Sequence, residues 1–162
     1  MIRPVKLSDA AEICDLYNYY IENTPTTFED KPLQYIAMEE RIRRISEKYP
    51  YLVREEDSGE INGIAYVNTW KERGAYKYSG ELSIFVRNGF QGQGMGRQLM
   101  EQLLKDVRKA NIHALIAGIV VPNERSVALH KKFGFTKVGQ FNEIGYKFSR
   151  WLDLSYWELI LK

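Results

Sequence analysis

The stretch QGQGMG at residues 91–96 decides the fold, because its glycines separate a short apolar segment from a long amphipathic one. The preceding segment, Glu81–Val86, is rich in residues that favour β-structure and has the length of a strand. The following segment, Arg97–Ala110, contains no glycine or proline and carries Leu99 and Leu103 at helical spacing. A strand, a glycine-rich turn and a helix form an anion site, because the first N–H groups of a helix lack partners and its dipole adds positive charge there.

Two common phosphate-binding motifs do not fit this stretch. A P-loop has Lys and then Ser or Thr after its last glycine, whereas Gly96 is followed by Arg97, so an NTPase is not expected. A dinucleotide fingerprint has a third Gly or Ala three residues after its second glycine, and the two possible frames place Arg97 or Leu99 there. The stretch instead resembles the Gln/Arg-x-x-Gly-x-Gly/Ala loop of the GNAT family of N-acetyltransferases, which wraps the pyrophosphate of acetyl-coenzyme A (acetyl-CoA). A glycine-rich surface turn is the alternative interpretation, because short glycine patterns recur by chance.

The composition is that of a soluble globular protein. With 162 residues, 44% of them hydrophobic and 27% charged, the chain has the size and balance of one ordinary domain. A net charge of +2 without a basic run gives no support for nucleic-acid binding. The single cysteine, Cys14, excludes an internal disulfide and a cysteine-based zinc cluster. Because the sequence shows neither a signal peptide nor a membrane-spanning run, we expect a cytoplasmic protein that does not bind membranes.

The order of the remaining segments predicts one α/β domain over residues 1–162. Strands are expected at residues 2–5, 51–55, 61–68, 76–86, 113–121, 136–141 and 152–161, the fifth of them buried on both faces. Helices are expected from Asp9, which forms a capping box with Glu12, from about Pro32 to Tyr49, from Arg97 to Ala110 and from Asn123 to Gly134. The resulting order β-α-α-β-β-β-α-β-α-β-β describes a mixed sheet with helices on both faces.

Four further segments are similar to those of the phosphinothricin N-acetyltransferases, a group within the GNAT family. WKERGAY at 70–76 resembles their Trp-Lys-x-Arg-x-Ala-Tyr segment, and Glu81 follows at the expected distance. PNERSVALH at 122–130 resembles their Pro-Asn-x-x-Ser-Val-x-Leu-His segment. The other two are Gly145-Tyr146-Lys147, followed by Trp151-Leu152-Asp153 and Trp157, and the mid-chain Tyr49-Pro50.

This likeness covers nearly the whole chain, from Asp9 to Trp157, and implies a fold and a chemistry. The fold is that of the acyl-CoA N-acyltransferases, a mixed sheet of about seven strands flanked by about four helices. The α-amine of an amino acid is mostly protonated at neutral pH, so acetyl transfer needs a base to remove a proton. The resemblance implies that Glu81 is that base or orders the water that acts as base; an exposed glutamate at a strand end is the alternative.

A second candidate catalytic residue follows from a departure within the family. Most GNAT enzymes carry a tyrosine four residues before a Gly-Phe pair and use it as the general acid toward the leaving thiolate. This sequence has His130 four residues before Gly134-Phe135, as the phosphinothricin group does. Three roles for His130 stay open: proton donor, second base, or a wall of the pocket.

The resemblance also assigns binding residues. Backbone groups of Ile84, Phe85 and Val86 are expected to hold the pantetheine arm like an added strand. The rest of the expected cofactor set is Gln91, Gly92, Gln93, Gly94, Met95, Gly96, Arg97, Asn123, Ser126 and Lys132. Arg73 is expected to bind the carboxylate or phosphinate of the substrate, because a guanidinium matches two acidic oxygens, unless it is a solvated surface arginine. The expected pocket walls are Phe28, Trp70 and Tyr76, each of which is also compatible with ordinary packing.

The sequence therefore predicts an acetyl-CoA-dependent N-acetyltransferase of the phosphinothricin and methionine sulfone or sulfoximine type. It would acetylate the α-amine of a small amino acid or analogue by direct attack in a ternary complex, and the resemblance implies a homodimer that needs no metal. One alternative is an acetyltransferase of another amine, such as a protein N-terminus or a polyamine. Arg73 argues against the polyamine, because it would repel a cationic acceptor. The other alternative is a non-catalytic module that binds acyl-CoA.

Overall fold

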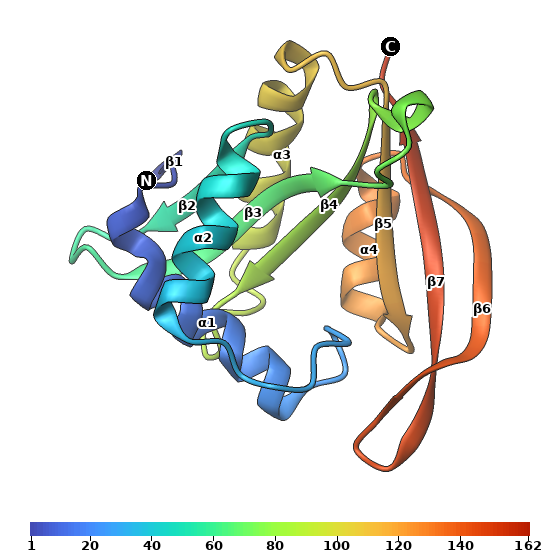
Figure 1. The fold of residues 1–162 in the computed structure, drawn as a ribbon, viewed down its shortest axis with the longest axis horizontal. Helices are drawn as coiled ribbons and strands as arrows, with labels where there is room; N and C mark the ends of the chain where they lie inside the picture. The colour runs from blue at the N-terminus through green and yellow to red at the C-terminus, as the bar shows by residue number, and fades with distance from the viewer.

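The computed structural model describes residues 1–162 as a seven-stranded mixed sheet with helices on both faces (Figure 1). The strands are β1 (Ile2–Pro4), β2 (Tyr51–Glu55), β3 (Ile61–Thr69), β4 (Ser79–Val86), β5 (Ala114–Val121), β6 (Thr136–Lys147) and β7 (Arg150–Ile160). The helices are α1 (Ala10–Asn23), α2 (Tyr35–Ser46), α3 (Met95–Lys109) and α4 (Glu124–Lys132), with short 3₁₀ turns η1 (Leu7–Asp9) and η2 (Gly74–Tyr76). The strands lie in the order β1-β2-β3-β4-β5-β7-β6, which confirms the predicted fold class. None of the helices has the length and apolar character needed to cross a membrane.

Two hydrophobic cores hold the helices on opposite faces of the sheet. On one face, α1 and α2 pack on β2 and β3 through buried side chains such as Ile13, Ile21 and Ile42. On the other face, α3 buries Leu99 and Leu103, the two leucines that predicted it. Each such side chain contributes about 1.5–3 kcal/mol when it leaves water, so the helices on both faces are held firmly against the strands.

The strands β4 and β5 separate after their first residues, and this separation creates the site. They are the one parallel pair of the sheet, and their pairing covers only Ser79–Glu81 opposite Ala114–Ile116. Beyond Glu81, β4 stays paired with β3 as far as Val86 but has no partner on the β5 side. Figure 1 shows the two strands diverging into a wedge, with the segment that follows α1 across its open end.

α1 begins at Ala10, directly after Asp9 as predicted, but its capping and the start of α2 differ from the prediction. The capping box of Asp9 with Glu12 is wrong, because the Asp9 carboxylate instead accepts hydrogen bonds from Arg3 and from the Lys6 N–H. The Glu12 carboxylate accepts a hydrogen bond from the N–H of Ile61 at 2.9 Å and so ties α1 to β3. The helix expected from Pro32 begins three residues later, at Tyr35, because a proline at a first helical position is favourable without being sufficient.

Four strands also differ from the prediction. β4 begins at Ser79 rather than residue 76, because Gly74–Tyr76 forms the turn η2. β5 was expected to be buried on both faces, but its Gly118 is exposed, because one face of this strand borders the wedge. β6 and β7 are longer than predicted and join through Phe148 and Ser149, which both adopt positive φ angles. Residues 142–151, which separate the two predicted strands, therefore form the end of a long hairpin.

Candidate active site

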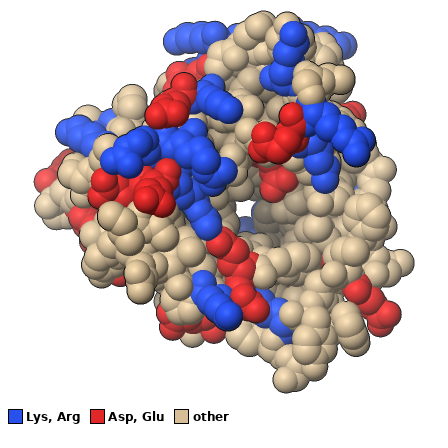
Figure 2. Space-filling model, in the orientation of Figure 1, with Lys and Arg blue, Asp and Glu red and all other residues tan.

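Two adjoining cavities occupy the wedge between β4 and β5. One, of about 500 Å³, lies against the glycine-rich stretch and is called the loop cavity; the other, of about 460 Å³, contains Glu81 and is called the Glu81 cavity. They share a wall made of Thr26, Ile84, Phe85, Asn123, Ser126 and His130. Figure 2 shows the molecule hollowed near its centre, with acidic and basic side chains around the opening. Two molecules bound in the two cavities would therefore meet at this wall.

The loop cavity is built largely from backbone. Gly92 and Gly94 adopt φ angles of 79° and 80°, in the left-handed region that is readily accessible only to glycine. α3 then begins at Met95, and its first hydrogen bond runs from the Gln98 N–H to the Gly94 carbonyl at 3.1 Å. The N–H groups of the first three helical residues therefore lack a helical partner and are free to bind an anion. All of residues 91–97 except Gln93 line the loop cavity.

The free edge of β4 and the start of α4 form the other sides of the loop cavity. Ile84, Phe85 and Val86 line it with the edge that faces away from β3. Asn123 caps α4, because its side-chain oxygen accepts a hydrogen bond from the Ser126 N–H at 3.2 Å, and its amide group stays available to a ligand. The exposed Lys132 lies in the last turn of α4 and borders neither cavity. The structure thus brings together every predicted cofactor residue except Gln93 and Lys132.

Glu81 lies at the last residue pair before the wedge opens. It stands opposite Asn68 of β3 and Ile116 of β5, and its side chain lines the Glu81 cavity. Burial raises the pKa of its carboxyl group, and the positive charge of Lys71 opposes this only in part. No hydrogen bond or ion pair holds the carboxylate, and no buried side-chain oxygen of the protein lacks a partner, so the carboxylate opens into the cavity. A carboxylate with a raised pKa is a stronger base, which suits removal of a proton near neutral pH.

His130 lies on the wall shared by the two cavities and is only 5% exposed. Its Nδ1 lies 2.7 Å from the carbonyl oxygen of Ser126 and must therefore carry the proton, because a carbonyl only accepts hydrogen bonds. Burial lowers the pKa of the imidazole, which the bond to Ser126 offsets in part. The ring is thus neutral near pH 7, and its Nε2 has a free lone pair. In this state His130 can accept a proton or order a water, but it cannot donate from Nε2.

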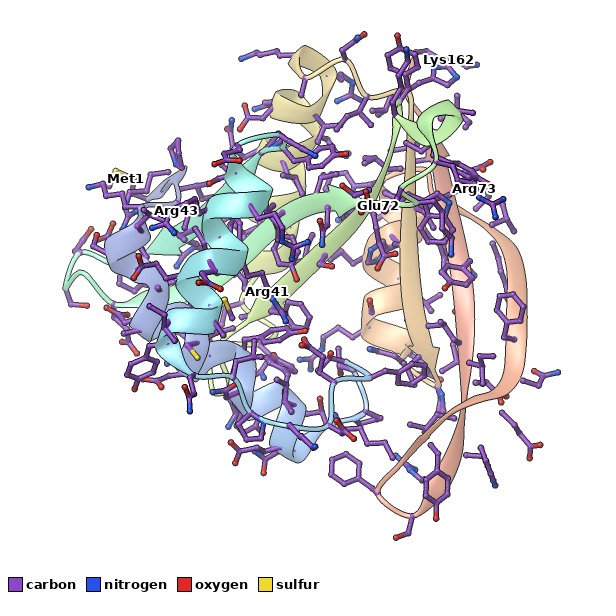
Figure 3. All side chains as sticks on the ribbon, viewed as in Figure 1. Met1, Arg41, Arg43, Glu72, Arg73 and Lys162 are labelled. Carbon is purple, nitrogen blue, oxygen red and sulfur yellow. The ribbon has the colours of Figure 1, made fainter.

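The four predicted substrate residues are not all at the cavity. Phe28 lines the Glu81 cavity. The Trp70 ring packs edge-on against Tyr156, which lines that cavity, with the ring centroids 5.4 Å apart. Arg73 lies beside η2 and Tyr76 within it; both are exposed, and neither lines the loop cavity or the Glu81 cavity. Figure 3 shows Arg73 on the side of β5 away from α2. A substrate role for Arg73 and Tyr76 stays a prediction that this single chain does not place at the cavity.

The sequence analysis missed a charged network in the Glu81 cavity. Arg41 of α2 donates two hydrogen bonds to the Glu29 carboxylate, at 2.9 and 2.6 Å. The Tyr17 hydroxyl of α1 donates to the same carboxylate, and the Arg41 guanidinium lies 5.6 Å from the centre of the Tyr17 ring. These bonds, with that from Arg41 first, lower the pKa of Glu29. Nothing in the sequence indicated this network, because its three residues come from separate elements.

Other missed residues complete the two cavities. The Tyr20 hydroxyl donates to the Val86 carbonyl beside the loop cavity, where Arg125 adds a positive charge. In the Glu81 cavity, the polar wall formed by β3 and β4 consists of Tyr66, Asn68 and Ser83 in addition to Glu81. Residues two apart in a strand share a face, so the predicted strand could have indicated Ser83 once Glu81 was chosen. No group of three or more His, Cys, Asp or Glu side chains is placed to hold a metal ion.

Comparisons with known sequences agree with this geometry. The profile of the acetyltransferase (GNAT) domain matches residues 2–156. The chain is 35% identical to the phosphinothricin N-acetyltransferase of Streptomyces viridochromogenes, over 97% of this chain and 85% of that protein. It is 34% identical to the L-methionine sulfoximine/L-methionine sulfone acetyltransferase of Salmonella typhimurium, over 99% of this chain and 94% of that protein. These matches confirm the family predicted from the motifs.

Solved structures extend the likeness to the fold. An acetyltransferase structure from Salmonella typhimurium, determined with its cofactor acetyl-CoA, superposes with a TM-score of 0.97 at 32% identity, over 100% of this chain and 94% of that one. A ribosomal-protein-alanine N-acetyltransferase from Brucella melitensis superposes with a TM-score of 0.96 at 31% identity, over 99% of both chains. The fold of this chain is thus shared with an acetyltransferase that binds acetyl-CoA and with one named for a ribosomal-protein alanine.

Proposed function

The chain belongs to the GNAT acetyltransferase family and is an acetyl-CoA-dependent N-acetyltransferase, and we propose that its acceptor is the α-amine of a small amino acid or analogue. Phosphinothricin, methionine sulfone and methionine sulfoximine are the proposed acceptor type. The observation that carries the proposal is Glu81, an unpaired carboxylate with a raised pKa beside the wall that separates the two cavities. A base in this position serves an amine in one cavity and a thioester in the other.

The proposed reaction assigns a task to each cavity. The free N–H groups at the start of α3 bind the pyrophosphate of acetyl-CoA, and the open edge of β4 holds its pantetheine arm. Glu81 takes a proton from the acceptor ammonium, directly or through water, and the freed amine attacks the thioester carbonyl. A new C–N bond forms and the C–S bond breaks; the attacking nitrogen loses its second proton, and the leaving thiolate takes one up. An N–H of β4 that faces the wedge can stabilise the charge that develops on the carbonyl oxygen.

The protonation state of the His130 ring limits the roles that we propose for it. Because Nδ1 carries the proton and is held by the Ser126 carbonyl, the neutral ring presents a lone pair at Nε2. It therefore acts as a second base or as an acceptor that orders water, and it can serve as the acid only after it has taken up a proton during turnover. This order of events fits direct transfer, in which one proton leaves the amine and one reaches the thiolate.

We include a homodimer in the proposal, supported by an apolar surface on the outer hairpin. The exposed large apolar side chains of β6 and of its turn into β7 are Val138, Phe141, Ile144, Tyr146 and Phe148, and Trp151 lies beside them at the start of β7. The rings of Tyr146 and Trp151 lie 4.9 Å apart on this surface. A patch of this kind on a solvent-facing hairpin is typical of an interface, and a second copy of the chain is the proposed partner. Light scattering after gel filtration measures the oligomeric state.

A cytoplasmic location is also part of the proposal. Cys14 is buried and unpaired, and its sulfur lies 3.2 Å from the Leu33 carbonyl. An unpaired thiol in the core is typical of a protein in a reducing compartment. Fractionation of cells that express the chain tests the location.

A protein N-terminus is the second candidate acceptor, because the similar structure from Brucella melitensis is named as a ribosomal-protein-alanine N-acetyltransferase. Such an acceptor also presents an α-amine to Glu81, but its α-carboxyl group is part of a peptide bond. A polyamine is less favoured, because the Glu81 cavity contains Arg41 and its other acidic side chain, Glu29, is already paired with that arginine. A non-catalytic module would bind acetyl-CoA without needing Glu81.

The test follows release of the free thiol from acetyl-CoA. Phosphinothricin, methionine sulfone and methionine sulfoximine are compared with a polyamine and with a peptide that has a free N-terminal alanine. We expect kcat/KM to be at least about tenfold higher with the amino-acid analogues than with the other amines. Greater efficiency with the peptide would favour the second candidate. Thiol release at the background rate with every amine, while acetyl-CoA binds, would leave only the non-catalytic module.

A further inference from the structure

The Glu81 cavity contains a single Lys or Arg side chain, Arg41, held in place by neighbours from two other elements. Glu29, from the segment after α1, accepts two hydrogen bonds from the guanidinium, and the Tyr17 ring lies beneath it. Figure 3 shows Arg41 on the side of α2 that faces the middle of the molecule, whereas Arg43 points away. A positive group fixed in the acceptor's cavity calls for a negative group on the acceptor.

We infer that Arg41 binds the acidic group of the acceptor and thereby selects small acidic amines over amides and polyamines. This inference rests on the proposed function, because it assumes that the acceptor occupies the Glu81 cavity. An amino acid carries one cation and at least one anion. Its ammonium group must approach Glu81 to lose a proton, so its anion needs a cation elsewhere in the same cavity. Arg41 is the one Lys or Arg side chain that lines it.

The Arg41 guanidinium has N–H groups that Glu29 does not use. It carries five N–H groups in a plane, and Glu29 uses one on each terminal nitrogen. The N–H at Nε and one on each terminal nitrogen are left for a ligand, and the side chain is 25% exposed. An acceptor carboxylate or phosphinate can therefore bind with two parallel hydrogen bonds while Glu29 stays in place. Because Glu29 and Tyr17 already restrict the side chain, little conformational entropy remains to be lost on binding.

The buried Lys147 keeps the net charge around Arg41 positive, although Glu29 is negatively charged. The Lys147 ammonium donates to the carbonyls of Thr24 and Thr27 at 2.9 and 2.8 Å, and it forms no ion pair. Its charge contributes to lowering the pKa of Glu29. Arg41, Glu29 and Lys147 together therefore carry a charge of about +1. Asp30 also acts on Lys147, but it is exposed and screened by solvent, so the attraction for an anion persists in the cavity.

The charge of Arg41 disfavours two kinds of acceptor. A polyamine would bring a second cation next to Arg41, and a peptide N-terminus would bring an uncharged amide in place of the carboxylate. In both cases the Arg41 guanidinium, which is partly out of water, would gain no anionic partner, and the acceptor would bind more weakly. The cluster therefore favours the amino-acid acceptor over the second candidate function.

The test substitutes Arg41→Met and compares methionine sulfone, its α-carboxamide and phosphinothricin as acceptors. Methionine sulfone has one anion, the amide has none, and phosphinothricin has two. We expect the KM for methionine sulfone to rise about 10- to 100-fold, because a hydrogen bond to a charged group contributes about 1.5–3 kcal/mol. The KM for acetyl-CoA and the efficiency with the amide should not change. If only the KM for phosphinothricin rises, Arg41 binds the side-chain phosphinate, and this result also supports the inference.

Two further variants separate recognition from folding. Arg43→Met is the matched control, because Arg43 lies on the same helix, is half exposed and pairs only with Glu39 on the surface; it should behave like the wild type. Glu29→Gln keeps an oxygen for Arg41 but removes the competing charge, so it should lower the KM for methionine sulfone several-fold. A merely structural role would make the Arg41 and Glu29 variants change in the same direction.

Several outcomes would overturn the inference while leaving the proposed function intact. One is wild-type turnover of amino acids together with an Arg41→Met variant that keeps its preference for acid over amide. Another is an equal loss with the acid and the amide. A third is loss of that preference in Arg73→Met but not in Arg41→Met, which would return the anion to the residue first predicted. If the wild type acetylates no amino acid, the proposed function and the inference both fail.

Discussion

The two cavities differ in how the chain builds them. The loop cavity is made mainly from two continuous stretches, the end of β4 with its glycine-rich turn and the start of α4, and it offers backbone groups to its ligand. The Glu81 cavity is made mostly from side chains of α1, α2, α4, β3, β4, β5 and β7 and of the segment after α1. Backbone groups suit a ligand that is the same throughout the family, whereas side chains suit an acceptor that changes between relatives. The chemistry takes place where the two meet.

Removing the charge of Glu81 should show most clearly that catalysis and acetyl-CoA binding depend on different cavities. Glu81→Gln should lower kcat about 10²- to 10⁴-fold, because general base catalysis is lost, while the Kd for acetyl-CoA stays unchanged. Thiol release and titration calorimetry measure the two quantities. A kcat that stays within about threefold of the wild type would show that Glu81 is not the base.

Straining the glycine-rich turn should damage the loop cavity alone. Gly94→Val places a β-branched side chain at a φ of 80°, which costs about 1–2 kcal/mol or more in backbone strain. The Kd for acetyl-CoA should rise about 5- to 30-fold, with the acceptor KM unchanged at saturating acetyl-CoA. Gly89→Val is the matched control, because Gly89 has a φ of 93° but does not line the cavity. Equal losses in both variants would point to general strain instead of a lost pyrophosphate site.

Crowding Phe28 should damage the Glu81 cavity alone. A Cβ at Gly145 would lie 2.6 Å from Cζ of Phe28, so Gly145→Ala must displace a ring that lines this cavity. We expect the acceptor KM to rise about 3- to 10-fold, or about 0.7–1.4 kcal/mol, because overpacking moves this ring, and the Kd for acetyl-CoA to stay constant. Gly139→Ala on the same strand meets nothing within 4 Å and serves as control. An unchanged acceptor KM would remove Phe28 from the pocket wall.

The smallest expected effect is a shift in pH dependence. Burial raises the pKa of Glu81 and the charge of Lys71 lowers it. Activity requires the unprotonated carboxylate, so kcat/KM should fall as the pH falls through this raised pKa. Lys71→Met removes the opposing charge and should move the acidic limb of the pH profile to higher pH. Lys77→Met, in the same loop, should leave the limb in place; a limb that moves equally in both variants would exclude a specific effect on Glu81.

The contrast between the cavities also explains what the sequence could predict. The glycine-rich turn, Asn123 and His130 lie in short motifs whose neighbours in sequence are their neighbours in space, so their approximate places followed from the motifs. Tyr17, Glu29 and Arg41 meet only because α1 and α2 pack together on the sheet. In the helical pattern Arg41 merely flanks the apolar positions, and no local signal separates it from a surface arginine.

The fold shows the same limit at smaller scale. Periodicity predicted α3 and the β2–β3 hairpin well, because both carry strong local patterns. It misplaced the start of α2, where Pro32 suggested a helix that begins only at Tyr35. It shortened β6 and β7, since solvent-exposed aromatics and glycines looked like a loop. It also could not place Arg73, because the path of the segment between β3 and β4 depends on tertiary packing.

The account depends most on where the two substrates meet. The direct measurement is a crystal structure of the Glu81→Gln variant with acetyl-CoA and methionine sulfone bound together. We expect the pyrophosphate on the N–H groups at the start of α3, the sulfur in the wedge between β4 and β5, and the acceptor amine within hydrogen-bond distance, about 3 Å, of the side chain at position 81. A pyrophosphate bound elsewhere, or an amine directed away from that side chain and from the thioester, would contradict the account.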